Sequence, residues 1–129
     1  MKRVLTDTCI FSFGYAAYSL IELAWRRYTH FTMGIAGGLC LLILYHIYKK
    51  HPSLSTLKKC LIGSMVITAV EFCFGCLLNL HLKLNIWDYS ALPLNVLGQI
   101  CPLFSIIWML LCLPICYITK KVKLLEERI

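Results

Sequence analysis

Residues 60–80 read CLIGSMVITAVEFCFGCLLNL, an apolar run that carries one charged side chain, Glu71. Its length is close to the roughly 20 residues that an α-helix needs to cross the hydrocarbon core of a bilayer. Three more stretches of similar character occupy residues 9–25, 31–48 and 100–119. Backbone groups in that core must be satisfied internally, so each stretch is expected to be helical. The sequence therefore predicts an all-α protein: an integral membrane four-helix bundle with a structured outer loop, forming one domain over residues 1–129.

The first apolar stretch has a second interpretation. Lys2 and Arg3 before an apolar run are typical of a secretory signal peptide. The run continues through Leu20 and Ile21 to Trp25, however, and no convincing small-residue cleavage site precedes a soluble domain. We expect a retained membrane span.

The basic residues are unevenly distributed between the two sides of the predicted spans. The formal net charge is +7, and ten of the 13 Lys and Arg residues fall on one side: Lys2, Arg3, Lys49, Lys50, Lys58, Lys59, Lys120, Lys121, Lys123 and Arg128. The positive-inside rule predicts a multi-pass protein of the cytoplasmic membrane with both termini in the cytoplasm. Because these cations flank spans rather than line one groove, we expect anionic membrane lipids, not nucleic acid, as their partner.

Motifs of catalysis or cofactor binding are missing from the sequence. There is no Walker loop, dinucleotide fingerprint or nucleophile elbow. The eight cysteines lie mostly within apolar spans, and the histidines show no ligand-like spacing, so we expect neither a metal site nor a cofactor. Structural packing is favoured over redox chemistry for Cys73 and Cys76, despite their Cys-x-x-Cys spacing. We expect no enzyme, and any ATP-driven step would need a separate polypeptide.

The connection between the third and fourth stretches, residues 87–101 (WDYSALPLNVLGQIC), is chemically unusual for a loop. It begins with Trp87, a residue type that suits the membrane interface, where the ring lies among headgroups. Pro93 and Gly98 restrict and relax the backbone at defined points. Two interpretations remain open: a structured connection that only joins two spans, or part of a binding site or partner surface on the outer side.

Two acidic residues within the spans are the main candidates for function. A carboxyl group at the depth of Glu71 is costly, so it is expected to face the bundle interior, a wet cavity or a partner. Glu22 precedes Arg26 by four residues, which predicts an intrahelical ion pair, yet both glutamates could also share one cavity. The candidate substrate- or ion-binding residues are Glu22, Glu71, Asp88, Tyr89, Asn95 and Gln99. A plain hydrogen bond of Glu71 between helices is the alternative.

Small residues in the second stretch predict close helix packing. Gly34 and Gly38 form a small-xxx-small pair that lets two helix backbones approach. Span one, span three and a second copy of the protein all remain open as the partner. Pro114 lies inside the fourth stretch and is expected to kink or loosen it.

Several of these residues together are similar to those of a known family. Glu22, Glu71, Trp87-Asp88-Tyr89-Ser90, Pro93, Asn95, Gly98 and Ile100-Cys101 resemble the bacterial ABC-transporter type IV (CmpB-like) membrane proteins. The chain departs from the family pattern at Gln99, where an Arg is usual, and it lacks the prolines that often begin span two. The missing Arg would remove a counter-ion for Asp88 or for a glutamate.

The resemblance implies a small inner-membrane protein acting as a permease-like transport component of unknown substrate. It would be homo-oligomeric or associated with a separate ATPase or other membrane subunit. The alternative is a non-transporting accessory or regulatory subunit that binds a partner through its outer loop. A membrane enzyme acting on a lipid is a third class, but no nucleophile–base pair supports it.

Overall fold

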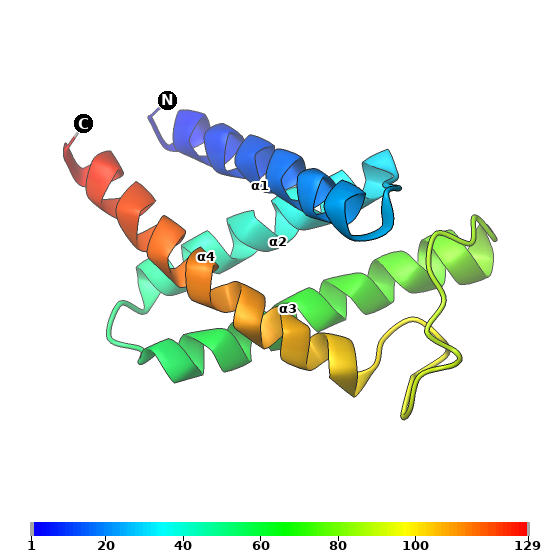
Figure 1. Cartoon of the computed structure of the whole chain (residues 1–129). Helices are drawn as coiled ribbons and strands as arrows, with labels where there is room; N and C mark the ends of the chain where they lie inside the picture. The colour runs from blue at the N-terminus through cyan, green and yellow to red at the C-terminus, as the bar shows by residue number, and fades with distance from the viewer. Residues whose placement is uncertain (1, 129) are drawn as a thin grey trace. The chain divides into compact units, whose positions relative to one another are not determined.

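The computed structural model describes residues 2–128 and contains four long helices (Figure 1). These are α1 (Lys2–Arg26), α2 (Phe31–Lys50), α3 (Thr56–Gly75), which continues into the π-helical segment η1 (Cys76–His81), and α4 (Pro102–Arg128). Each of the four, with η1 counted as part of the third, is long and apolar enough to cross a membrane. The all-α prediction is confirmed, because the described residues contain no strand and only an isolated bridge between Val96 and Ile100.

The helices extend beyond the predicted spans at several ends. α1 begins at Lys2 rather than near residue 9, and α4 continues to Arg128 rather than ending near residue 119. The hydropathy pattern locates the part of a helix that suits the hydrocarbon core, whereas good helix formers such as Lys, Leu and Glu continue it into the polar region. At the other end of α4, Pro102 is the first helical residue, a position where its missing N–H costs nothing.

The contacts between residues divide the protein into two compact units. The first contains residues 1–53 and 117–129, and the second contains residues 54–116. The residues of α4 are thus shared between the units, with the division falling after Cys116. Pro114 lies within α4, which continues as helix beyond it.

In the first unit, α1 and α2 approach closely at glycines. A Cβ added to Gly14 would lie 2.9 Å from the Cα of Gly38, and one added to Gly34 would lie 2.6 Å from the ring of Tyr15. A Cβ on Gly38 would lie 2.7 Å from the backbone oxygen of Phe11. The predicted close approach at Gly34 and Gly38 is confirmed, and the partner is α1.

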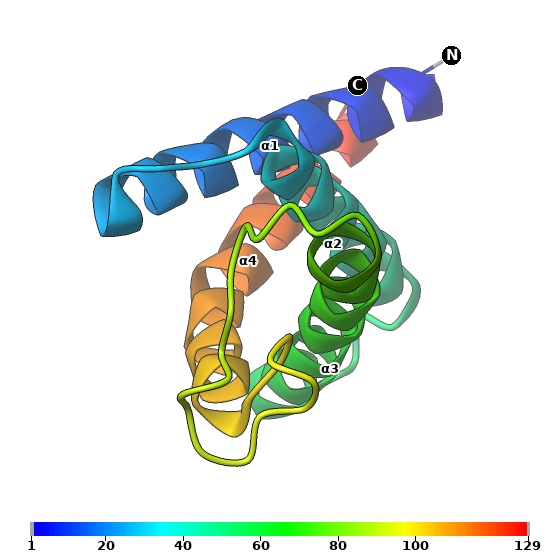
Figure 2. The ribbon, with the colours of Figure 1, turned by 90° about the vertical axis from the view of Figure 1, so that its right-hand side faces the viewer.

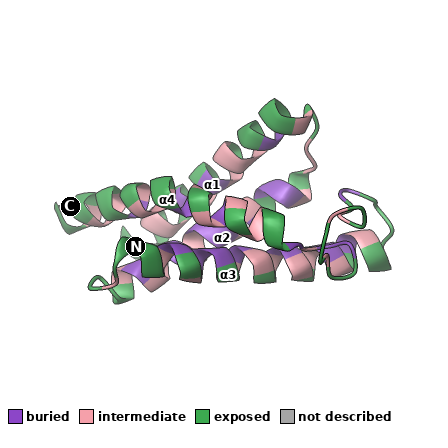
Figure 3. Cartoon of the chain, turned by 60° about the horizontal axis from the view of Figure 1, so that its bottom comes forward, coloured by how far each residue is buried: buried purple, intermediate pink, exposed green. Residues whose placement is uncertain are grey.

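The most deeply buried side chains of this unit lie on α2. Leu44 is fully buried and Tyr45 is 1 % exposed, while large apolar side chains such as Val4, Leu5 and Leu20 remain exposed on α1. Figure 3 colours each helix by burial, with buried residues in purple and exposed ones in green. Exposed apolar surface of this kind on a span-length helix suits contact with lipid.

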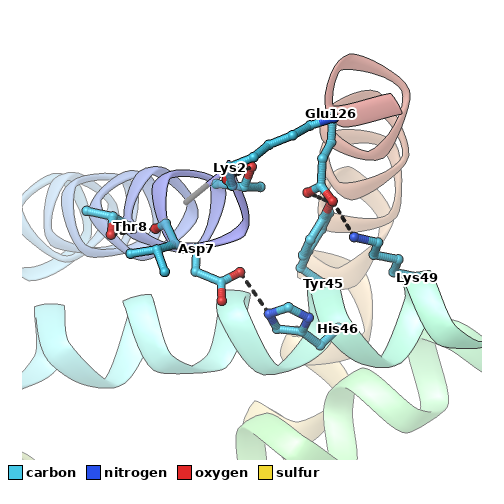
Figure 4. Close-up of polar contacts among 9 residues, drawn as sticks. Lys2, Asp7, Thr8, Tyr45, His46, Lys49 and Glu126 are labelled. Carbon is cyan, nitrogen blue, oxygen red and sulfur yellow. Dashed lines mark hydrogen bonds and ion pairs between the residues drawn. The ribbon is translucent and has the colours of Figure 1, made fainter. Parts of the chain in front are cut away.

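Polar contacts link α2 to α1 and to the end of α4 (Figure 4). His46 Nε2 lies 2.9 Å from an oxygen of Asp7 on α1. The hydroxyl of Tyr45 donates a hydrogen bond of 2.7 Å to Glu126, and Lys49 forms an ion pair with the same carboxylate. One acidic side chain of α4 is therefore shared by two partners that lie one helical turn apart on α2.

In the second unit, side chains of α3 bond to the first turns of α4. The hydroxyl of Ser64 donates a hydrogen bond of 2.6 Å to the backbone oxygen of Ser105, and Thr68 lies 2.8 Å from the Ser105 hydroxyl. Residues 82–101 connect the two helices and face the viewer in Figure 2. Ser64, Thr68 and Glu71 are spaced by four and three residues, so they share the α3 face that meets α4.

Candidate functional site

Glu71 is buried in the second unit with both carboxyl oxygens hydrogen-bonded. Its side chain comes from α3, and the residue is 8 % exposed. The hydroxyl of Tyr89, in the connection, donates to Oε2 at 2.8 Å. The indole Nε1 of Trp108, on α4, donates to Oε1 at 3.2 Å. Three segments that are far apart in sequence thus converge on one acidic side chain.

The two aromatic residues that bond to this carboxyl group both contact a third ring, that of Phe104. The ring of Tyr89 stacks on Phe104 with centroids 4.6 Å apart and an interplanar angle of 8°. Phe104 in turn lies 6.0 Å from Trp108, at a tilt of 44°. Phe104 and Trp108 are four residues apart, so they project from the same face of α4. The site combines one acid with three aromatic faces.

Hydrogen bonds within the connection hold Tyr89 in place. The backbone N–H of Tyr89 donates to the Gly98 carbonyl at 2.7 Å. Asn95 bridges the turn, because its amide nitrogen donates to the Leu92 carbonyl and its oxygen accepts from the Gly98 N–H, each at 2.9 Å. Gly98 has a φ of +73°, and a Cβ there would lie 2.8 Å from Asp88 Oδ1. Asn95 and Gly98 therefore shape the loop that presents Tyr89.

A second cluster fixes the loop to the end of α3 and to η1. Gln99 is 3 % exposed, and its side-chain oxygen accepts a hydrogen bond of 2.8 Å from Asn79. Its backbone oxygen accepts a 3.0 Å bond from the indole of Trp87. A Cβ on Gly75 would lie 2.6 Å from the Gln99 side chain. The absence of a side chain at Gly75 makes room for Gln99 and Trp87.

The position of Trp87 differs from the one that its residue type favoured. Trp87 is buried inside the protein, with 8 % exposure. The reason is local, because Gly75 leaves space for the ring and the Gln99 carbonyl provides an acceptor for the indole N–H. Trp87 serves as a structural anchor of the loop.

Asp88 does not face Glu71, although its neighbour Tyr89 does. Asp88 is exposed and accepts hydrogen bonds from the hydroxyl and the backbone N–H of Ser90, the latter at 2.9 Å. These bonds hold the pKa of Asp88 below its ordinary value, since they stabilise the ionised form. Asp88 therefore caps a turn, and Tyr89 makes the direct contact with Glu71; a role for Asp88 in binding stays a prediction.

Glu22 forms the intrahelical ion pair that its spacing predicted. Arg26 Nε lies 2.6 Å from Glu22 Oε2, and Glu22 is 6 % exposed. Glu22 belongs to the first unit and Glu71 to the second, so a cavity shared by the two stays a prediction.

Pro93 is exposed in the turn that precedes Asn95.

Sequence reasoning missed the two residues of α4 that complete the site. Phe104 and Trp108 look like ordinary members of an apolar span, so their residue types did not mark them as site residues. Their spacing did carry a signal, because Cys101, Ser105, Trp108 and Cys112 recur every four or three residues, as Ser64, Thr68 and Glu71 do on α3. Those two periods would have placed Trp108 and Glu71 on the facing sides of their helices, but not in contact with each other.

The chemistry of the site is that of an acceptor for hydrogen-bond donors and positive charge. Both oxygens of Glu71 accept bonds from neutral donors, and both donors belong to aromatic side chains that contact Phe104. Among residues 2–128, no three His, Cys, Asp or Glu side chains gather in a way that could hold a metal ion. All eight cysteines are free thiols.

Comparison with known proteins identifies the family. Residues 31–127 match the model of the family described as Putative ABC-transporter type IV, so the match covers α2, α3, the connection and nearly all of α4. No curated protein and no solved structure matches the chain. The matched range contains Glu71, Tyr89 and Trp108, and the chain belongs to the Putative ABC-transporter type IV family.

Proposed function

We propose that the protein is a permease-like transport component in which Glu71 binds the transported species. The observation that carries this proposal is the buried carboxylate of a membrane-spanning helix, contacted by the Tyr89 hydroxyl from the loop outside that helix. Carboxyl groups within spans are costly and are characteristic of ion and substrate pathways. A contact from the loop gives such a pathway an entrance that can open and close.

The proposal includes the setting in which the protein works. Four spans enclose little volume, so we propose that the chain self-associates or joins another membrane subunit. A separate ATPase would supply energy, since the sequence carries no Walker loop. We place the protein in a bacterial inner membrane with both termini in the cytoplasm, on the basis of the uneven distribution of Lys and Arg.

Flux through purified protein in liposomes tests the role of Glu71. Proton and monovalent cation movement would be followed with an internal pH dye under an imposed potential, for wild type, Glu71→Gln and Glu127→Gln. Glu127 is an exposed carboxylate near the end of α4 and serves as the matched control. We expect flux in wild type and in the control, and a loss of at least tenfold in Glu71→Gln. Equal flux in all three would remove Glu71 from the pathway.

One observation favours a second function, that of an accessory subunit with a partner on its outer loop. Leu94 and Leu97 are 82 % and 63 % exposed, and both have a positive φ, so the folded loop holds two leucines outward at a conformational cost. A photo-crosslinking residue at position 94 in native membranes distinguishes the two. A single reproducible protein adduct would support the accessory function, whereas lipid adducts alone would contradict it.

A further inference from the structure

We propose that the species bound by Glu71 is a protonated amine that carries an apolar substituent. This inference rests on the proposed function, and it assigns a substrate class to the same site. The acid and the two donors that bond to it bear on the charge and the hydrogen-bonding group of the ligand. The three aromatic rings bear on its apolar substituent.

The hydrogen-bond geometry favours an ammonium group at the position of the Tyr89 hydroxyl. Tyr89 donates to Glu71 Oε2 at 2.8 Å, within the range of about 2.7–2.9 Å that is usual for N⁺–H···O⁻ bonds. An ammonium N–H and the phenol O–H would therefore bond to Oε2 at similar distances, so that one can replace the other. Trp108 remains bonded to the other oxygen, at 3.2 Å, and keeps the carboxylate oriented during the exchange.

The aromatic rings favour an organic cation. Phe104 has no polar atom, and its ring lies between those of Tyr89 and Trp108, at 4.6 Å and 6.0 Å. Aromatic faces attract cations within about 6 Å of the ring centroid, and they also accept apolar substituents. A small metal cation instead requires several oxygen ligands, about six to eight for Ca²⁺. An indole and a phenyl ring provide none.

The elements that carry the donors determine how the ligand enters. Trp108 belongs to α4, which is joined to α3 at Ser64 and Ser105, whereas Tyr89 belongs to the connection. The anchor at Trp87 and Gln99 is separate from the bond between Tyr89 and Glu71. A ligand thus competes with the hydrogen bond between Tyr89 and Glu71 and with the stack of Tyr89 on Phe104, whereas the anchor at Trp87 and Gln99 involves other atoms. Tyr89 acts as an internal competitor for the site.

Calorimetric titration of the full chain in lipid nanodiscs tests this inference. The probes are benzylammonium, its neutral analogue benzyl alcohol, and sodium ion, at neutral pH. Wild type should bind benzylammonium at least tenfold more tightly than either other probe. Glu71→Gln should lose that preference, Phe104→Leu should weaken benzylammonium binding several-fold, and Glu127→Gln should behave as wild type.

Tyr89→Phe separates a ligand site from a structural contact. Phenylalanine keeps the ring stacked on Phe104 but removes the competing hydroxyl, so benzylammonium should bind several-fold more tightly than to wild type. A purely structural role for Tyr89 would leave affinity unchanged or reduce it. The inference is overturned if Tyr89→Phe binds benzylammonium no more tightly than wild type does. It is also overturned if wild type binds benzyl alcohol and benzylammonium equally. Neither result depends on the folding of Glu71→Gln.

The titration and the flux assay fail independently. Benzylammonium binding that requires Glu71, without flux in liposomes to which benzylammonium has been added, would support the amine site and contradict transport. Flux that requires Glu71, without benzylammonium binding, would support transport and contradict the amine as ligand.

Discussion

The indole nitrogen of Trp87 donates a 3.0 Å hydrogen bond to the backbone carbonyl of Gln99, twelve residues further along the chain. This bond closes the loop that carries Tyr89, and it is buried on both sides, since Trp87 and Gln99 are 8 % and 3 % exposed. The folded connection therefore depends on a contact inside the protein.

Replacing Trp87 with Phe should unfold the loop more easily. The substitution leaves the buried Gln99 carbonyl without this donor and removes ring volume beside Gly75, so we expect a loss of about 1–3 kcal/mol in the free energy of unfolding. Thermal unfolding in detergent measures it. Trp25→Phe is the control, because Trp25 is 74 % exposed. Equal shifts for the two variants would contradict the anchoring role of Trp87.

The turn at Asp88 should lose stability as the pH falls. Bonds from the hydroxyl and N–H of Ser90 lower the pKa of Asp88, so the stabilisation is fully present above the pKa of the unfolded chain and is lost as pH falls through the lower, folded value. An NMR titration of the Asp88 carboxyl should give a midpoint below that of a free aspartate. Ser90→Ala should raise the midpoint, and no change in that variant would remove the assigned cause.

Adding a methyl group at Gly38 should separate α1 from α2. The new Cβ would lie 2.7 Å from a backbone oxygen of α1, which cannot turn aside as a side-chain end can. We expect a cost of about 1–3 kcal/mol, typical of overpacking. Thermal unfolding measures it, with Ile35→Ala on the exposed face of α2 as the comparison. A smaller loss for Gly38→Ala than for Ile35→Ala would argue against the close approach.

Tyr45 and Glu126 should be energetically coupled. The hydrogen bond between them is 2.7 Å long, and Tyr45 is almost wholly buried. A double-mutant cycle with Tyr45→Phe and Glu126→Gln should give a coupling energy of about 1–2 kcal/mol, since the acceptor is charged. The same cycle with Glu127→Gln in place of Glu126→Gln should give a value near zero. Equal coupling in both cycles would show that the bond contributes nothing specific.

The orientation in the membrane should follow the basic residues. Single cysteines at Ser53, Leu94 and Lys120 on a cysteine-free background, checked for folding, would be treated with an impermeant thiol reagent on intact cells. All three positions are exposed in the protein. We expect labelling at position 94 alone. Labelling at 53 and 120 with protection at 94 would reverse the proposed topology.

The helices could be predicted because hydropathy over about 20 residues reports directly on membrane crossing. The sequence also singled out Glu71 and Tyr89 as candidates, since an acid and a phenol stand out in apolar surroundings, and the structure brings the two into contact. It gave no indication that η1 is π-helical, or that Asn79 within it bonds to Ile86 and Gln99. The burial of Trp87 was equally hidden, as it depends on the space beside Gly75, twelve residues earlier.

The order of synthesis gives the contacts of Glu71 a further consequence. Tyr89 and Trp108 lie 18 and 37 residues after Glu71, so the ribosome completes α3 before either donor exists. Inserted alone, α3 would place its acidic side chain in lipid at a cost of roughly 3 kcal/mol on insertion scales. We therefore expect α3 to remain at the translocon until α4 emerges, and the two helices to enter the bilayer as a pair.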